Sequence, residues 1–317
     1  MTAVRWGLLG AGFVASKGVA PAMRAADGAT IQAVAARDVA RAESLEPRWS
    51  SASYDDVLHA DDVDAVYISL PNDLHLQWVT AALEAGKHVL CEKPLALDAQ
   101  QVAEMTATAG RTGLVLVEAS WNRWHPRTLR AEEILAGVDG PVDVRAWFTF
   151  PGVPDDNYRL DPARGGGALL DVGCYATAAA LVSLGGDVQP VSAAQSLGRT
   201  GVDLTTEAVL ESGRGRATVL GSFEQPESQG WTVTADKLSL SLEHPAFTSW
   251  HDASSLRVAV RGEDSVETFE ACDPYRLMVE AVSRRIRGDD AAWVLPLSTS
   301  LEVARTIDAI RDLAGRP

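Results

Sequence analysis

The sequence opens with Trp6-Gly7-Leu8-Leu9-Gly10-Ala11-Gly12-Phe13-Val14-Ala15, which joins an apolar run to two closely spaced glycines. Gly10-x-Gly12-x-x-Ala15 is typical of the strand–turn–helix unit that binds a dinucleotide. In that unit the first glycine permits a tight turn and the second lets the backbone approach a pyrophosphate. The following helix directs its positive end at the phosphates. We expect the turn to contact such a cofactor through Gly10, Gly12, Phe13 and Val14; a merely structural turn is the alternative.

Short apolar runs alternate with helical patterns through the first 120 residues. Such runs are typical of strands buried on both faces of a parallel sheet. The predicted strands are Val4–Leu9, Ile31–Ala36, Ala65–Leu70, His88–Cys91 and Leu114–Val117. Asn72 can cap a helix that ends at Gly86, and Asp98 with Gln101 forms a capping box for the next helix. Residues 1–120 are therefore predicted to form a doubly wound α/β domain of the Rossmann type.

The pattern changes beyond residue 121, where segments become longer and richer in β-branched and aromatic residues. We predict an α+β domain over residues 121–317, with a large, open and mostly antiparallel sheet. Its predicted strands are Val142–Phe150, Val191–Ser196, Leu204–Glu211, Ala217–Phe223, Thr232–Leu242 and Leu256–Val260. Its predicted helices are Ala168–Leu184, Tyr275–Arg287 and Ser298–Leu313, the last of which is apolar enough on one face to pack back toward the first domain.

Composition excludes several classes of partner. The 317 residues carry a net charge of -15, which argues against nucleic acid and against an anionic membrane surface. We see no apolar run of the roughly 20 residues that a membrane-spanning helix needs. Cys91, Cys174 and Cys272 form neither a metal-binding pattern nor a disulfide framework, so we expect no metal and a cytoplasmic location.

The choice of cofactor depends on the residues after the second predicted strand, Arg37 and Asp38. An acidic residue near this point binds the ribose hydroxyls of NAD, whereas an arginine suits the 2′-phosphate of NADP. Arg37 favours NADP, and Asp38 keeps NAD open. A solvated pair at a strand end is the further alternative.

Two more segments follow predicted strands at the edge where open parallel sheets bind ligands. The first contains Leu70, Pro71, Asn72 and His75, which we expect near the cofactor, although the asparagine can be a helix cap and the histidine structural. The second is Glu92-Lys93-Pro94. A lysine at a strand end can polarise a carbonyl or lower the pKa of a neighbouring group, and the alternative is a solvated side chain.

The most unusual stretch runs from Tyr158 to Tyr175 and contains three consecutive glycines, Gly165-Gly166-Gly167. Glycines there make a backbone that can approach a ligand closely. Asp171 and Tyr175 follow four residues apart, so a helix would place a carboxylate and a phenol on one face. The alternative is a helix cap followed by a core tyrosine.

Together these motifs resemble the glucose–fructose oxidoreductase / inositol dehydrogenase / MocA family over essentially the whole chain. The resemblance rests on Gly10-x-Gly12-x-x-Ala15, Pro71-Asn72-x-x-His75, Glu92-Lys93-Pro94 and Gly165-Gly166-Gly167-x-x-x-Asp171-x-Gly173-x-Tyr175. It implies a Rossmann domain, a second domain with an open sheet, and a homodimer or homotetramer assembled through that sheet. Many members carry a histidine where this chain has Tyr175 and an aspartate where it has Ala178. The tyrosine is similar to the branch with dimeric dihydrodiol dehydrogenases and NADP-dependent xylose dehydrogenases.

That branch implies Tyr175 as acid/base, Lys93 as its partner and Asp171 as a substrate-orienting group. The phenol suits the role only if a nearby ammonium favours its ionised form, because its ordinary pKa is about 10. Substrate contacts are expected from a segment after the last Rossmann strand and from the glycine-rich stretch: Trp121, Asn122, Arg123 and Arg159. The tryptophan can instead belong to the core.

The sequence therefore predicts an NADP-dependent oxidoreductase, with NAD as the alternative cofactor. It would transfer hydride between nicotinamide and a carbinol or carbonyl carbon of a polyhydroxylated substrate: a sugar, a keto-sugar or a cyclic trans-diol. Two other functions stay open: a non-catalytic sensor that binds dinucleotide and sugar, and a self-contained hydride shuttle with tightly held cofactor.

Overall fold

A computed structural model describes residues 2–315, which group into two compact units. The first unit takes the chain up to Trp124 together with Asp273–Leu301, and the second takes His125–Cys272 with the chain from Glu302 onward. Each unit is a group of residues in spatial contact, and each joins segments that are distant in the sequence. The functional division into residues 1–120 and 121–317 stays a prediction.

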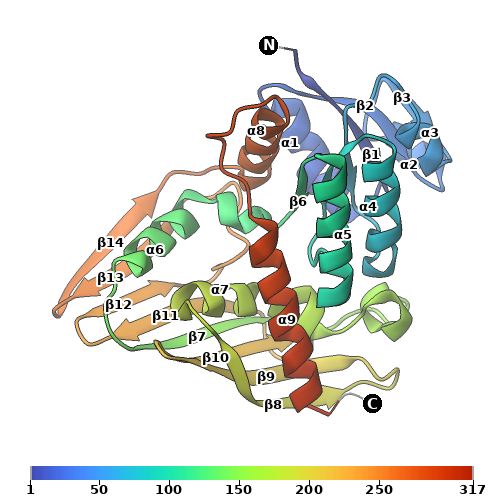
Figure 1. Ribbon diagram of the computed structural model, residues 1–317. Coiled ribbons are helices and arrows are strands. Elements are labelled where there is room, and N and C mark those ends of the chain that lie inside the picture. Colours follow the sequence, from blue (N-terminus) through green and yellow to red (C-terminus); the bar gives the residue numbers. More distant parts are fainter. Residues whose placement is uncertain (1, 316–317) are drawn as a thin grey trace. The chain divides into compact units, whose positions relative to one another are not determined.

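A six-stranded, fully parallel sheet forms the centre of the first unit, in the order β3-β2-β1-β4-β5-β6. Figure 1 labels β1, β2, β3 and β6 of this sheet. Its strands are β1 (Val4–Leu9), β2 (Ala29–Ala35), β3 (Trp49–Ser51), β4 (Ala65–Ile68), β5 (His88–Cys91) and β6 (Leu116–Glu118). The interior strands β1, β4 and β5 are almost entirely buried, as their apolar runs predicted. This order, with its reversal between β1 and β4, is that of the dinucleotide-binding doubly wound fold.

The helices of the first unit lie between the strands of this sheet and after them. They are η1 (Ala15–Val19, a π-helical turn), α1 (Ala20–Ala25), α2 (Val39–Glu43), α3 (Tyr54–Leu58), η2 (Asn72–Leu74), α4 (His75–Glu84), α5 (Ala99–Thr112), η3 (Trp121–Trp124) and the later α8 (Pro274–Ile286). Helices α4 and α5 pack together, as do α1 and α8. Because right-handed crossovers progress in opposite directions from β1 and from β4, helices cover both faces of the sheet.

Of the two helix caps predicted in this unit, one is confirmed and one is wrong. The Asp98 carboxylate accepts the Gln101 N–H at 2.8 Å, and Gly113 ends α5 in the left-handed conformation, so the capping box is confirmed. The prediction that Asn72 caps the next helix is wrong. The chain first makes the short turn η2, and neither Pro71 before η2 nor Leu74 before α4 makes a side-chain cap.

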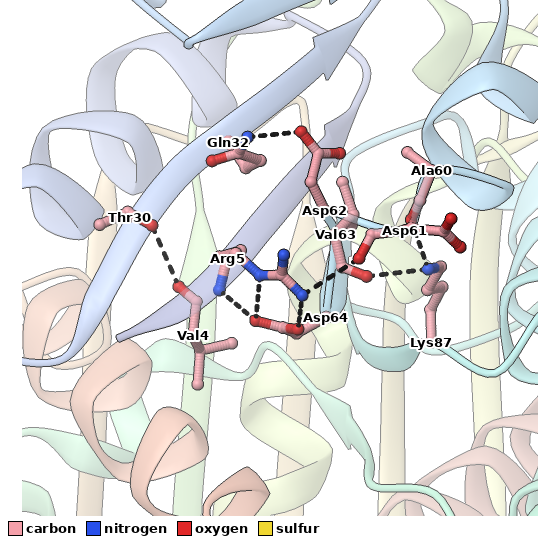
Figure 2. Close-up of polar contacts among 10 residues, drawn as sticks. All are labelled: Val4, Arg5, Thr30, Gln32, Ala60, Asp61, Asp62, Val63, Asp64 and Lys87. Carbon is pink, nitrogen blue, oxygen red and sulfur yellow. Dashed lines mark hydrogen bonds and ion pairs between the residues drawn. The ribbon is translucent and has the colours of Figure 1, made fainter. Parts of the chain in front are cut away.

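A polar network holds the amino-terminal edge of the first sheet, opposite the edge where ligands bind such sheets (Figure 2). The Arg5 guanidinium contacts both oxygens of Asp64, at 2.6 Å and 3.0 Å, and the Arg5 backbone N–H donates to the same carboxylate at 2.8 Å. The Lys87 ammonium donates to the carbonyls of Ala60 and Val63 at 2.7 and 2.8 Å. These contacts fix the turn that leads into β4.

An eight-stranded sheet forms the second unit, in the order β14-β13-β12-β11-β7-β10-β9-β8. Its strands are β7 (Val142–Thr149), β8 (Gln189–Leu197), β9 (Asp203–Ser212), β10 (Gly215–Ser222), β11 (Ser228–Ala235), β12 (Leu238–Leu242), β13 (Ser254–Val260) and β14 (Glu263–Phe269). Among the described strands of this sheet, β7 and β10 form the one parallel pair, so the predicted mostly antiparallel sheet is confirmed.

The second unit also contains helices, three of which lie within one long apolar segment. They are α6 (Pro126–Ala136), η4 (Tyr158–Leu160), η5 (Pro162–Arg164), η6 (Leu169–Gly173, a π-helical turn) and α7 (Cys174–Leu184). The last helix, α9 (Leu297–Leu313), gives its first residues to the first unit and the rest to the second. Residues 162–184 are long and apolar enough to span a membrane, contrary to our expectation, but 89% of the most apolar window is buried within the protein. This segment is therefore a core helix.

One predicted strand was wrong, and two strands were not predicted. The predicted strand Thr232–Leu242 is two strands, β11 and β12, joined at Asp236-Lys237, which lacks the glycine of the strongest hairpin signals. Strand β3 was missed because it has three half-buried residues and no apolar run. Strand β14 was missed because it is an acidic and largely exposed edge strand.

Candidate active site

The glycine-rich turn lies at the carboxyl end of β1, where the strand order reverses. The Gly10 N–H donates to the Ala35 carbonyl at 2.9 Å, and the Ser69 N–H donates to the Leu9 carbonyl at 3.0 Å. These two bonds join the turn to the ends of β2 and β4. The turn therefore occupies the switch point at which doubly wound sheets bind their ligands.

The two glycines of this turn are glycines for different reasons. Gly10 has φ +100°, and a Cβ there would lie 2.8 Å from the Ser69 carbonyl oxygen, so the fold itself excludes a side chain. Gly12 has no such constraint: the nearest atom to a Cβ would be 4.0 Å away. The space above Gly12 is left open by the chain, which fits the close approach of a pyrophosphate.

A helix begins directly after the turn. The Ser16 N–H donates to the Gly12 carbonyl at 2.9 Å, and Ala15 is fully buried against the sheet, as the motif requires. Phe13 is 77% exposed, although a large apolar side chain is more often buried. Backbone N–H groups at this helix end can bind phosphate oxygens.

Three charged residues follow β2 near the turn. Arg37 is exposed. The Asp38 carboxylate caps α2 by accepting the Ala40 N–H at 3.1 Å, so this carboxylate already has a structural partner. The guanidinium of Arg41 donates to the Ala11 carbonyl at 2.7 Å, within the glycine turn itself. Arg41 was missed from the sequence, because Arg37 lies before the cap of α2 and the two arginines share no helix face.

His75 joins two segments that are distant in the sequence. Its Nε2 lies 2.9 Å from the Leu70 carbonyl, and its Nδ1 lies 3.0 Å from the Pro94 carbonyl and 3.3 Å from that of Leu95. The ring is fully buried, and burial lowers the pKa of His75. The histidine thus holds the segment after β4 against the segment after β5, and a cofactor contact by its ring stays a prediction.

Glu92 is a buried carboxyl group beside Lys93. The Tyr67 hydroxyl donates to it at 2.6 Å, and the Lys93 backbone N–H lies 3.3 Å from its other oxygen. Burial raises the pKa of Glu92 to about 7, against the lowering effects of Tyr67 and Lys93. Glu118, at the end of β6, is also buried with a raised pKa, and it accepts the Leu95 N–H at 3.1 Å. The lysine therefore follows a strand end fixed by buried carboxyl groups.

The segment after β6 is packed within the first unit. Trp121 is 6% exposed and stacks on Tyr275 with ring centroids 4.5 Å apart, and Trp124 meets Trp293 edge-on at 5.0 Å. Asn122 and Arg123 are also buried. One face of the Trp121 ring thus packs in the core, as the alternative interpretation of this residue expected. The predicted substrate contacts of this segment stay predictions.

The three-glycine turn of the second unit packs closely against other residues of the same unit. A Cβ on Gly166 would lie 2.5 Å from the Arg159 carbonyl oxygen, and one on Gly167 would clash with the carboxylate of Asp203. The expectation that these glycines serve ligand approach is therefore corrected at both positions. They let the turn close on Arg159 and let Asp203 reach the start of the helix, where it accepts the Leu169 N–H at 2.7 Å.

Three predicted site residues gather in the second unit. The Arg159 Nε donates to the Asp171 carboxylate at 2.7 Å. Tyr175 follows in the first turn of α7, 7% exposed, with its ring centroid 5.6 Å from Phe148 and 5.8 Å from Phe247. Tyr175 also interacts electrostatically with Arg159. The carboxylate, the guanidinium and the phenol therefore form one cluster.

The predicted site residues thus form two groups, one in each unit. The first contains the glycine turn, the residues after β4 and the segment around Lys93; the second contains Arg159, Asp171 and Tyr175. Sequence reasoning missed Tyr67 and Asp203 in these groups. A single polar residue in a buried strand or at a strand start carries no distinctive pattern, and only its partner reveals its role.

Comparison with known proteins identifies the family. Residues 4–120 match the model described as "Oxidoreductase family, NAD-binding Rossmann fold", GFO_IDH_MocA, and residues 138–241 match the GFO/IDH/MocA C-terminal domain. The chain is 38% identical to D-xylose 1-dehydrogenase (NADP(+)) 2 of Haloferax volcanii, over 98% of this chain and 97% of that protein. It is 33% identical to trans-1,2-dihydrobenzene-1,2-diol dehydrogenase of Xenopus laevis, over 69% of each.

Comparison with solved structures supports the same family. A 3-ketoreductase from Actinomadura kijaniata, in complex with NADP and TDP-benzene, superposes with a TM-score of 0.90 and 29% identity over 98% of both chains. The resemblance inferred from the motifs is thereby confirmed. The chain belongs to the GFO/IDH/MocA family of oxidoreductases, in which a Rossmann sheet with a glycine turn is joined to a second, mostly antiparallel sheet.

Proposed function

We propose that this protein is an NADP-dependent oxidoreductase that transfers hydride to or from a carbinol carbon of a sugar, a keto-sugar or a cyclic trans-diol. The observation that carries the proposal lies in the first unit. His75 fixes the segment of Lys93 to the carboxyl end of β4, next to a glycine turn whose second glycine leaves open space. An amine and a phosphate-binding turn thus belong to one edge of one sheet.

Several residues fit the proposed cofactor. The open space over Gly12 and the amino end of the helix after it would hold the pyrophosphate. Arg37, with Arg41 anchored on the turn, would bind the 2′-phosphate of NADP. The engagement of Asp38 as a helix cap weighs against its use on the ribose of NAD. The relatives named with NADP support the same choice.

The proposed chemistry uses Lys93 from the first group and Asp171 and Tyr175 from the second. A bound nicotinamide would supply hydride exchange at its C4 position. In reduction the Tyr175 hydroxyl would donate its proton to the developing alkoxide, and in oxidation it would take that proton back. Lys93 would favour the ionised phenol, and Asp171 would accept hydrogen bonds from substrate hydroxyls. Lys93 belongs to the first unit and Tyr175 to the second, and their pairing follows from the family resemblance.

The proposed substrate class follows from relatives of different activity. They are named for D-xylose, for dTDP-linked didehydro-dideoxyglucose and for a trans-1,2-diol. Each name describes an oxygenated carbon beside another oxygenated carbon. We therefore propose a substrate with vicinal oxygens; assembly as a homodimer or homotetramer and a cytoplasmic location stay predictions.

A substrate panel tests the proposal. Purified protein is mixed with NADP or NAD and aldoses or trans-diols, or with NADPH and keto-sugars or diketones, and the absorbance of the reduced cofactor is followed. We expect turnover with at least one vicinal substrate and a preference for NADP. Tight NADP binding without turnover on any member would contradict the enzymatic function and favour the sensor; a preference for NAD would contradict the assignment of Arg37.

A further inference from the structure

The turn that carries Arg159 is fixed on both sides of that residue. Its backbone N–H donates to the Asn157 side chain at 3.0 Å, and its carbonyl accepts the Gly167 N–H at 2.9 Å. The Gly167 carbonyl in turn accepts the Asp171 N–H at 3.2 Å. Two consecutive backbone bonds therefore connect Arg159 to Asp171 through Gly167.

The side chains close the same ring. The Arg159 Nε lies 2.7 Å from Asp171 Oδ2, and the two side chains are 30% and 12% exposed. The guanidinium also lies over the Tyr158 ring, with its Cζ 5.1 Å from the ring centroid. Because backbone, ion pair and aromatic ring all constrain the guanidinium, it is preorganised on this carboxylate.

A carboxylate in this position creates a problem for the proposed acid/base. A nearby negative charge disfavours the ionised form of a phenol. The groups that the structure puts against the Tyr175 ring from β7 and from the segment before β13 are uncharged, Phe148 and Phe247. The Asp203 carboxylate accepts hydrogen bonds from the Leu169 N–H and the Thr206 hydroxyl. Asp171 lies four residues before Tyr175 in the same helical segment, and Arg159 interacts electrostatically with the phenol as well as with the carboxylate.

We propose that Arg159 is a positioning residue: its guanidinium orients the Asp171 carboxylate for substrate hydroxyls and offsets the negative charge that this carboxylate imposes on Tyr175. The assignment deepens the proposed function and rests on it. The Arg159 Nε is committed to Asp171, and the expectation that Arg159 also anchors the substrate stays a prediction.

The test is the pH profile of turnover in the oxidative direction, where ionised Tyr175 acts as the base. In Arg159→Met the rising limb moves to higher pH by roughly one unit, because Asp171 is left without its counter-charge. Arg159→Lys stays near the wild-type limb. The double variant Arg159→Met/Asp171→Asn moves back toward wild type. Arg199→Met is the matched control, since Arg199 is 88% exposed and pairs only loosely with Asp155 at 3.7 Å.

A merely structural arginine would lower turnover in Arg159→Met without moving the limb, and that result would overturn the assignment. So would a double variant whose limb stays with the single variant. Tyr175 is titrated directly as well, from the ultraviolet phenolate difference between each variant and its Tyr175→Phe counterpart. This titration needs no turnover. If the pKa of Tyr175 shifts in Arg159→Met but Tyr175→Phe stays active, the proposed function is refuted and the effect of Arg159 on the phenol still holds. If the pKa of Tyr175 does not shift in Arg159→Met, the role of Arg159 is refuted.

Discussion

At the residue scale, Gly10 and Gly12 separate folding from binding. Gly10 is required by its backbone conformation and by the carbonyl of Ser69, whereas the nearest atom to a Cβ on Gly12 would lie 4.0 Å away, which is ordinary contact. A residue that the fold does not require but the proposed function does is the sharpest place to test a binding site.

We expect Gly12→Ala to weaken NADP binding at least about tenfold, which corresponds to roughly 1.4 kcal/mol. The added methyl would occupy the space proposed for the pyrophosphate. The free energy of unfolding without cofactor should change by less than about 1 kcal/mol, since the site has no strain for alanine. Titration calorimetry and denaturant unfolding measure the two quantities.

Gly10→Ala is the matched control. Its Cβ would meet the Ser69 carbonyl at 2.8 Å in a backbone conformation that disfavours alanine. We expect a loss of roughly 1–3 kcal/mol in the free energy of unfolding. Equal NADP affinity in Gly12→Ala and wild type would show that the phosphates lie elsewhere.

Glu92 makes stability depend on pH. Its pKa is about 7 in the folded protein against 4.5 for the ordinary group, so the folded state binds the proton more tightly than the unfolded state. The sign follows from linkage: this group stabilises the folded state fully below about pH 4.5, and that contribution disappears as pH rises to about 7.

Glu92→Gln should remove this dependence while keeping an oxygen that accepts the Tyr67 hydroxyl. Between pH 4.5 and pH 7 the wild-type free energy of unfolding should fall relative to the variant by up to about 3 kcal/mol, the value of a shift of this size. Denaturant unfolding of both proteins at several pH values measures the difference. Parallel curves across this range would mean that the carboxyl group is ionised at little cost.

At the scale of elements, Asp203 connects β9 to the start of the central helix of the second unit. Its carboxylate accepts the Leu169 N–H at 2.7 Å and the Thr206 hydroxyl at 2.8 Å, and the residue is 8% exposed. The absence of a side chain at Gly167 gives it room. The element that carries Asp171 and Tyr175 therefore depends on a residue that the sequence pattern did not reveal.

Asp203→Ala should lower the free energy of unfolding by roughly 1–3 kcal/mol, because a buried N–H and a buried hydroxyl lose their acceptor. Asp203→Asn should lose less, because its amide oxygen still accepts one of the two bonds. Thermal and denaturant unfolding of both variants measure this order. If alanine proves no worse than asparagine, the carboxylate does not hold the helix start.

The elements themselves were largely predictable where burial dictates composition. Strands β1 and β5 have the predicted bounds, because both of their faces are buried and the apolar run is the strand. Edge strands β3 and β14 were not predictable, because exposed edges impose no periodicity. The π-helical turns at Ala15–Val19 and Leu169–Gly173 also lacked any signal, since side-chain periodicity does not distinguish them from α-helix.

At the scale of the whole molecule, the motifs predicted which residues belong to the site better than they predicted what those residues contact. The glycine turn, His75 and Lys93 come together at one sheet edge because parallel strands end on the same side. The partner of Asp171 was not predictable. Arg159 lies twelve residues away on an irregular turn, and only the folded backbone of the three-glycine turn closes that distance.

The central claim is that the phenol of Tyr175 moves the proton while NADP binding belongs to the other unit. The most direct test is Tyr175→Phe, assayed for NADP affinity and for turnover on the best substrate of the panel. We predict that the dissociation constant of NADP stays within about twofold of wild type, while turnover falls by roughly 10²–10⁴-fold, the range of general acid–base catalysis. Turnover within a few-fold of wild type would contradict the account.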